Sequence, residues 1–227
     1  MALEALCVLW THDSAPVKQV MREDGEDEMR WINSEINSFY RTYVQLYSAA
    51  MGPSRGVVEQ ILTMLDHQGN VPSVDANDPE SDQLFRQITL REHSLSVARE
   101  AIDMVKRYHK DYEMLVGRML IITLGHDLGV CSNAQIPGGV GTKSLLILEP
   151  MVQDLPFKEV VAEAISTFRK TNPKSQEARI LRAAEASVRK KELQRIQLLS
   201  ATPGVPLTDM TKISALIGSH NKVNTDS

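Results

Sequence analysis

Apolar residues recur at helical spacing along most of the chain, so the hydrophobic pattern predicts helices before any other feature. A first amphipathic helix is predicted over residues 28–52, where it stops at Gly52-Pro53. Its apolar stripe consists of Ile32, Ile36, Phe39, Tyr43 and Tyr47. A second helix is predicted over residues 54–69, and the two form an N-terminal helical extension within residues 1–70. The polar stretch 69–82, with two prolines and three aspartates, marks a boundary.

The main domain, residues 83–200, also consists of helical patterns, because no period-two alternation bounded by turn residues occurs in it. Helices are predicted over residues 91–111, 113–127, 155–170 and 175–197. The segment 113–127 is apolar nearly all round and is predicted to be the buried central helix. A glycine-rich loop is predicted over residues 131–144 and a mostly irregular tail over residues 201–227. The fold class is therefore all-α.

Composition excludes several classes of protein. The chain is 42% hydrophobic and 24% charged, which is typical of a folded soluble domain. Its net charge is -4 and only 5% of its residues are aromatic, so it carries no strong signal for nucleic-acid binding. Two distant cysteines, Cys7 and Cys131, are expected to be reduced, which favours a cytoplasmic protein. The apolar N-terminus is too short to span a bilayer, and we expect no membrane segment in this chain.

The aromatic residues of the first predicted helix leave two alternatives open. Phe39, Tyr40, Tyr43 and Tyr47 gather on that helix, where their rings either pack on the core or form the contact of a homodimer.

Two polar residues, His126 and Asp127, end the most apolar helix of the chain and precede Gly129. Polar groups held at the edge of a core need partners. The other His-Asp pair, His12-Asp13, lies in a polar stretch that contains a proline, where Asp is most simply a turn residue. Context therefore makes His126-Asp127 a candidate for chemistry and His12-Asp13 a structural element.

Two further polar residues each lie on the apolar face of a predicted helix. Glu185 lies on the stripe formed by Ala178, Leu181 and Val188, and His93 precedes Val97 and Ala101 at four-residue steps. Each alone is explained by a satisfied core histidine or by a carboxylate paired with Arg182 or Arg189. Together with His126 and Asp127 they supply two imidazoles and two carboxylates from three core-facing helices. That set suits a divalent cation.

The segments "REHSLSVAREA", "LGHDLGV" and "ILRAAEASVRKKEL", in this order, resemble the HD superfamily of metal-dependent phosphohydrolases over roughly residues 84–197. The resemblance implies an HD-like helical bundle and one divalent metal ion (Fe, Mn, Ni, Zn or Mg) held by His93, His126, Asp127 and Glu185. It further implies hydrolysis of a nucleotide or another small phosphoester, in which Asp127 is the catalytic residue that both ligates the metal and orients the attacking water.

The chain departs from the family pattern at several positions. Glu185 stands where relatives usually have aspartate, and Val130 stands where they often have lysine. No histidine lies between His126 and His220, so a two-metal site is not expected. The alternative function is therefore an HD-fold module that has lost catalysis and binds or regulates within a larger assembly.

Three basic residues are candidates for binding substrate phosphate because of their charge. The alternative explanation is that they are ordinary cations at helix ends or on the surface. They are Lys143, Arg169 and Lys170. The glycine-rich segment around Lys143 is not a P-loop, because Thr142 stands where that motif requires glycine.

Overall fold

The computed structural model describes residues 31–75, 83–131 and 138–200, and every regular element within them is a helix, which confirms the all-α prediction. The elements are α2 (Ser34–Phe39), the π-helical turn η1 (Tyr40–Gln45), α3 (Ser48–Met51), α4 (Ser54–Gln68), the 3₁₀ helix η2 (Gln83–Gln87), α5 (Leu90–Tyr108), α6 (Glu113–Gly125), the 3₁₀ helix η3 (Leu128–Cys131), α7 (Val140–Val152), α8 (Lys158–Thr167) and α9 (Gln176–Ser200). The predictions for Cys7, His12-Asp13 and the tail 201–227 lie outside the described residues.

The helical prediction for residues 28–52 is confirmed over most of the described part of that segment, but a single helix is not, because the segment is divided into α2, η1 and α3. The carboxylate of Asp66 accepts hydrogen bonds from the backbone N–H groups of Ile32, at 2.7 Å, and Asn33, at 2.9 Å. These contacts hold the chain outside a helix until Ser34, and Ile32 is 73% exposed instead of joining the apolar stripe. At the other end Gly52 adopts a φ of +51°, which is suited to glycine and ends the segment as predicted.

The aromatic residues of this segment contribute to the core of the same chain. Phe39 and Tyr47 are buried, and Tyr40 and Tyr43 are partly buried against the core. The Lys106 ammonium lies over the rings of Tyr43 and Tyr47, at 5.7 and 5.5 Å from their centroids. Packing of the rings on the core, one of the two alternatives, is therefore confirmed, and a homodimer stays a prediction.

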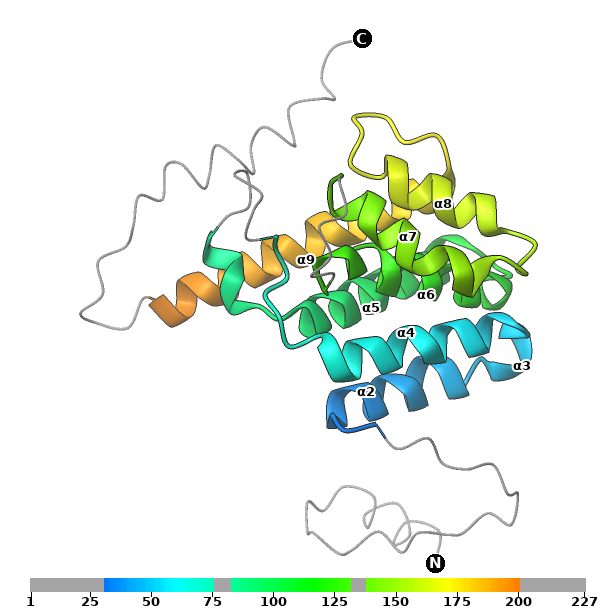
Figure 1. Cartoon of the computed structure of the whole chain (residues 1–227), viewed down its shortest axis with the longest axis horizontal. Helices are drawn as coiled ribbons and strands as arrows, with labels where there is room; N and C mark the ends of the chain where they lie inside the picture. Colours follow the sequence, from blue (N-terminus) through cyan, green and yellow to red (C-terminus); the bar gives the residue numbers. More distant parts are fainter. Residues whose placement is uncertain (1–30, 76–82, 132–137, 201–227) are drawn as a thin grey trace, which may run out of the picture. The chain divides into compact units, whose positions relative to one another are not determined.

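The central element is α6, which contacts α3, α4, α5, α8 and α9. Figure 1 shows α5 and α6 between the α2–α4 segment and the α7–α8 pair. The segment Glu113–Cys131 is apolar and long enough to cross a membrane by length and composition, but 72% of its apolar window is buried inside the fold. Such burial is typical of the core helix of a helical bundle. The prediction of a buried central helix is confirmed.

Helix α7 was not expected, because the sequence pattern predicts a loop up to Ser144 and no helix before residue 155. The helix instead begins at Val140, within that predicted loop. The hydroxyl of Ser144 donates to the carbonyl of Val140 at 2.9 Å and accepts from the backbone N–H of Gly129 at 2.8 Å. A Cβ at Gly129 would lie 2.3 Å from the Val140 carbonyl oxygen. The missing side chain of Gly129 thus lets α7 pack directly on η3.

Helices α5 and α9 pack along each other and carry the polar residues that meet the end of α6. The side chain of Thr89 caps α5 by accepting a hydrogen bond from the backbone N–H of Glu92 at 3.2 Å. This cap starts α5 one turn before His93. The first turns of α5 therefore lie against the middle of α9.

Candidate metal centre

Three helices bring the four predicted ligands together inside the fold. His93 comes from the first turns of α5, His126 and Asp127 follow directly after α6, and Glu185 lies in the middle of α9. One candidate ligand atom from each residue lies within 4.8 Å of all the others. Both histidines and Asp127 are buried, and the Glu185 side chain is 17% exposed. Residues 92 positions apart in sequence thus form one compact cluster.

Each imidazole turns its Nε2 atom toward this cluster and its Nδ1 atom away. The Nδ1 atom of His93 lies 2.8 Å from Oε1 of Glu192, and the Nδ1 atom of His126 lies 2.7 Å from the carbonyl oxygen of Thr123. A carboxylate or a backbone carbonyl on one ring nitrogen fixes the other nitrogen as a metal ligand. Both rings therefore have the outer partner that metal-binding histidines usually have.

The two carboxylates are each shared between the cluster and an arginine. Oδ2 of Asp127 lies 3.2 Å from Nε2 of His126, while its Oδ1 accepts from Nη2 of Arg169 at 2.9 Å. Oε2 of Glu185 lies 2.8 Å from Nε2 of His93 and 3.2 Å from Nε2 of His126. Its Oε1 accepts from Nε of Arg189 at 3.2 Å. One oxygen of each carboxylate therefore faces the imidazoles.

The charged side chains of the cluster strongly shift one another's pKa values. Burial would lower the pKa of His126, but Asp127 and Glu185 outweigh burial and raise this pKa to about 10. Burial would raise the pKa of Asp127, yet His126 and Arg169 lower it to about 2. Against the same penalty, His93 and His126 hold the pKa of Glu185 well below its usual range. Without a cation, the cluster is an imidazolium–carboxylate network.

This donor set could hold a metal ion. Two imidazole nitrogens and two carboxylate oxygens form a mixed N/O site of the kind that divalent first-row metals accept. Without a metal, the raised pKa keeps a proton on the imidazole of His126. The imidazoles have to be neutral to ligate, so a metal would replace that proton.

The three predicted phosphate-binding residues have different positions. Arg169 is half-exposed and contacts Asp127. The ammonium of Lys143 lies 3.7 Å from Asp75, and the Lys170 side chain is exposed. Within the described part of the chain, only Arg169 of these three has a hydrogen bond or ion pair to the four-residue cluster.

Sequence reasoning missed the outer partners of the histidines. Glu192 lies seven residues after Glu185, so two helical turns bring it to the same face of α9, and this spacing is a signal that could have found it. Arg189 was considered only as a structural partner of Glu185, and it contacts both glutamates. Thr123 contributes through its backbone carbonyl, for which the residue type gives no signal.

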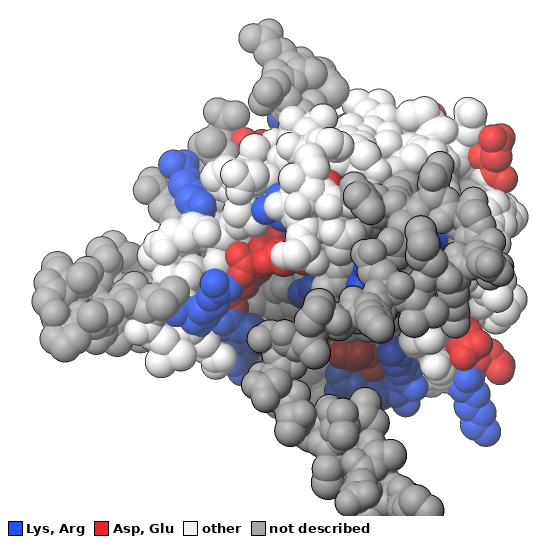
Figure 2. All heavy atoms as spheres, turned by 90° about the horizontal axis from the view of Figure 1, so that it is seen from below, with Lys and Arg blue, Asp and Glu red and all other residues white. Residues whose placement is uncertain are grey.

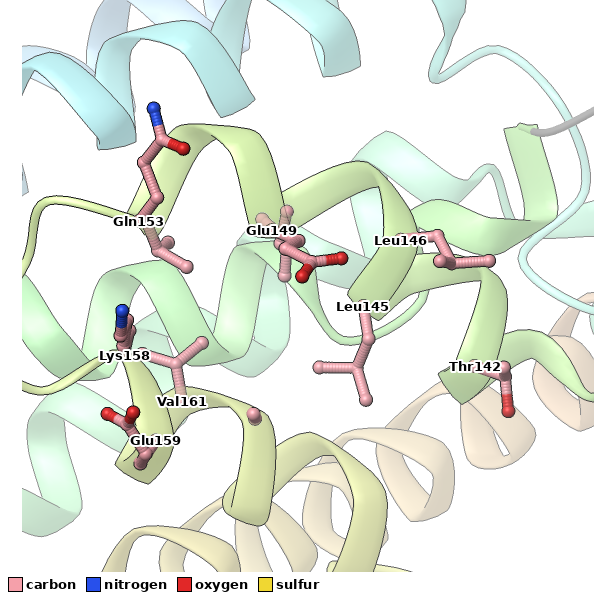
Figure 3. Close-up of a pocket in the computed structure, with 11 residues that line it drawn as sticks. Thr142, Leu145, Leu146, Glu149, Gln153, Lys158, Glu159 and Val161 are labelled. Atoms are coloured by element: carbon pink, nitrogen blue, oxygen red, sulfur yellow. The ribbon is translucent and has the colours of Figure 1, made fainter.

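A separate groove of about 610 Å³ lies between α7 and α8. In Figure 3, Leu145 and Glu149 of α7 line it together with Lys158 and Val161 of α8. No residue of the four-residue cluster lines this groove. Groups with strongly shifted pKa values lie in the cluster, which makes the cluster the candidate for chemistry.

No protein-family model matches the chain, and neither does any curated protein or solved structure with which it was compared. The chemistry of the cluster is therefore inferred from its own residues.

Proposed function

We propose that the chain is a metal-dependent phosphohydrolase of the HD type that acts on a nucleotide or another small phosphoester. One observation carries the proposal: ligand atoms of His93, His126, Asp127 and Glu185 converge within 4.8 Å, while both Nδ1 atoms are engaged elsewhere. A divalent cation held by these residues would polarise a phosphoryl oxygen and acidify a water molecule for attack on phosphorus.

The charge of the cluster supports an anionic substrate. Three carboxylates belong to it or contact it directly, and two guanidinium groups neutralise part of their charge. With neutral imidazoles these five groups leave one negative charge, which a divalent cation would turn into one net positive charge. A loaded site of this composition attracts a phosphate group.

Arg169 is the side chain proposed to bind the substrate phosphate. Its guanidinium contacts Oδ1 of Asp127, and its side chain is 56% exposed, so it links the buried cluster to solvent. A guanidinium can bind two phosphate oxygens at once. In this proposal Arg169 moves its hydrogen bond from Asp127 to the substrate, which frees Oδ1 of Asp127 to orient water.

A small substrate agrees better than a nucleic acid with the described residues on the face shown in Figure 2. On the face shown in Figure 2, basic and acidic side chains of the described residues are interspersed among neutral ones, and no extended basic patch is in view. Sequence-independent nucleic-acid binding depends on several Lys and Arg side chains that neutralise successive phosphates.

The second candidate is an HD-fold module that lacks catalysis and has a binding or regulatory role in a larger assembly. A specific observation favours it: Asp127 and Glu185 already have arginine and histidine partners within the protein. A buried ion-pair network whose members are all paired can persist without a metal.

Metal analysis of the purified protein, combined with a panel of phosphoesters, distinguishes the two candidates. The wild type is compared with the His126→Ala, Asp127→Ala double variant and with a His12→Ala, Asp13→Ala control, which changes the other His-Asp pair of the chain. Stoichiometric metal and turnover in the wild type and the control, both lost in the first variant, would support the enzyme. A folded wild type without metal or turnover would favour the module.

A further inference from the structure

Three charged residues of α9 follow one another along the face that meets α5. Glu185, Arg189 and Glu192 lie at offsets of four and three residues, which places them on one side of the helix. Glu185 contacts Nε2 of His93, and Glu192 contacts Nδ1 of the same ring. Both nitrogens of His93 are therefore engaged by α9.

Glu192 is fixed by Arg189, and Arg189 is fixed in turn by its surroundings. Nη1 of Arg189 donates to Oε2 of Glu192 at 3.0 Å and to the hydroxyl of Ser73 at 2.9 Å. Its Nη2 donates to the backbone carbonyl of Ser73 at 3.1 Å, and its Nε donates to Glu185. The guanidinium carbon also lies 4.9 Å from the ring centroid of Phe85. Every guanidinium nitrogen has a partner, so Glu192 is held by a rigid group.

We infer that Glu192 is a positioning residue of the proposed metal site. By accepting the Nδ1–H of His93, its carboxylate selects the tautomer in which the lone pair of Nε2 points into the cluster. Glu192 does not itself ligate, because it lies on the opposite ring nitrogen from the cluster. The inference rests on the metal binding of the proposed function and is independent of turnover.

The tautomer of His93 in the wild type tests this role without changing Glu192. Long-range proton–nitrogen NMR of the zinc-loaded protein, with His93 assigned through a His93→Gln variant, should show the proton on Nδ1 and none on Nε2. A proton on Nε2, or a mixture of tautomers in the zinc-loaded protein, would overturn the assignment.

A charge-removing substitution tests how much metal affinity depends on Glu192. In Glu192→Gln one carboxylate oxygen becomes an NH2 donor, which cannot accept from Nδ1–H of His93 or from Nη1 of Arg189, so one hydrogen bond is lost. We expect zinc to bind about 10- to 100-fold more weakly, as is usual for the outer partners of metal ligands. Competition with a chromophoric chelator measures this affinity, and circular dichroism checks the fold.

Glu177→Gln is the matched control, because Glu177 also lies on α9 and pairs with Arg118 at 2.7 Å, with its side chain 15% exposed. This control should bind zinc as the wild type does. Equal zinc affinities in Glu192→Gln, Glu177→Gln and the wild type would show that Glu192 has only a structural role. A wild type that binds no zinc would overturn this inference, whereas turnover that depends on another divalent cation would leave the proposed function standing. Zinc binding without turnover would leave the inference standing.

Discussion

Oε2 of Glu185 lies 2.8 Å from Nε2 of His93, although 92 residues separate the two in sequence. The glutamate is long enough to reach this position from the axis of α9, and an aspartate is one methylene shorter. We therefore expect Glu185→Asp to weaken metal binding by about tenfold or more, equivalent to about 1.4 kcal/mol. Chelator competition measures the change, with Glu177→Asp on the same helix as the control. Metal binding as tight as in the wild type would mean that α9 moves to bring the shorter aspartate side chain within reach of the cluster.

Arg169 is predicted to act mainly on substrate binding. Arg169→Gln should raise KM for a phosphoester substrate about tenfold, since it removes a charged partner of the phosphate. The Arg169 side chain is 56% exposed but pairs with the buried carboxylate of Asp127, and the substituted amide can still donate to it, so the free energy of unfolding should fall by about 1 kcal/mol. Lys170→Gln is the control, since Lys170 is exposed next to it in sequence. Steady-state kinetics with equal KM values for the two variants would contradict the assignment.

Metal uptake should release protons. The pKa of His126 is raised to about 10, so at pH 7 the metal-free imidazole is protonated, whereas a ligand has to be neutral. Glu185 outweighs burial and raises the pKa of His93 as well, so binding at pH 7 releases at least one proton per ion, and affinity should rise about tenfold or more per pH unit below these pKa values. Titration calorimetry in buffers of different ionisation enthalpy measures this release. Identical apparent enthalpies in two such buffers would contradict it.

Gly129 is predicted to tolerate no side chain. A Cβ there would lie 2.3 Å from the backbone oxygen of Val140 and 2.9 Å from the backbone nitrogen of Ser144, so α7 would have to move. Gly129→Ala should lower the free energy of unfolding by about 1–3 kcal/mol. Gly56→Ala is the matched control in the first turn of α4, where nothing lies within 4 Å of the added Cβ. It should stabilise the helix by about 0.5–1 kcal/mol. Denaturant unfolding that gives both variants the same sign would be inconsistent with this packing.

Asp66 should contribute stability that depends on pH. Burial would raise its pKa, but hydrogen bonds from Asn33 and Ile32 outweigh burial and lower it. Asp66→Ala leaves these donors unpaired and should cost about 1–3 kcal/mol at pH 7. Because the pKa is lowered in the folded state, the contribution is complete above the ordinary pKa of aspartate and is lost as pH falls below it. Unfolding measured at pH 7 and pH 3 should show the difference shrinking, whereas Asp103→Ala, at an exposed site, should show little difference at either pH.

The sequence pattern predicted the features that depend on helical period. Because side chains three and four residues apart share a face, the apolar stripe of α9 indicated that Glu185 faces inward. The same reasoning predicted that the side chain of His93 points into the core. The apolar run before His126 indicated the buried end of α6. These residues were found because their immediate neighbours in sequence determine their environment.

Features that depend on distant contacts were not predicted. Helix α7 begins among Gly139 and Gly141 and contains Pro150, so its local propensity is poor, and packing on η3 stabilises it instead. Ile32 follows the helical period, yet the carboxylate of Asp66 holds its backbone N–H outside the helix. The outer partners Glu192 and Thr123 were missed because their importance comes from the rings that they orient.

The pairing of α5 with α9 makes the site a property of the complete tertiary fold. The candidate ligands His93 and Glu185 lie at the two ends of a long loop of chain, and only His126 and Asp127 are neighbours before that loop closes. A cation held there would connect the two ends of the loop, like a cross-link whose stabilising effect on the folded state grows slowly with loop length. Metal occupancy would then report that α9 has docked.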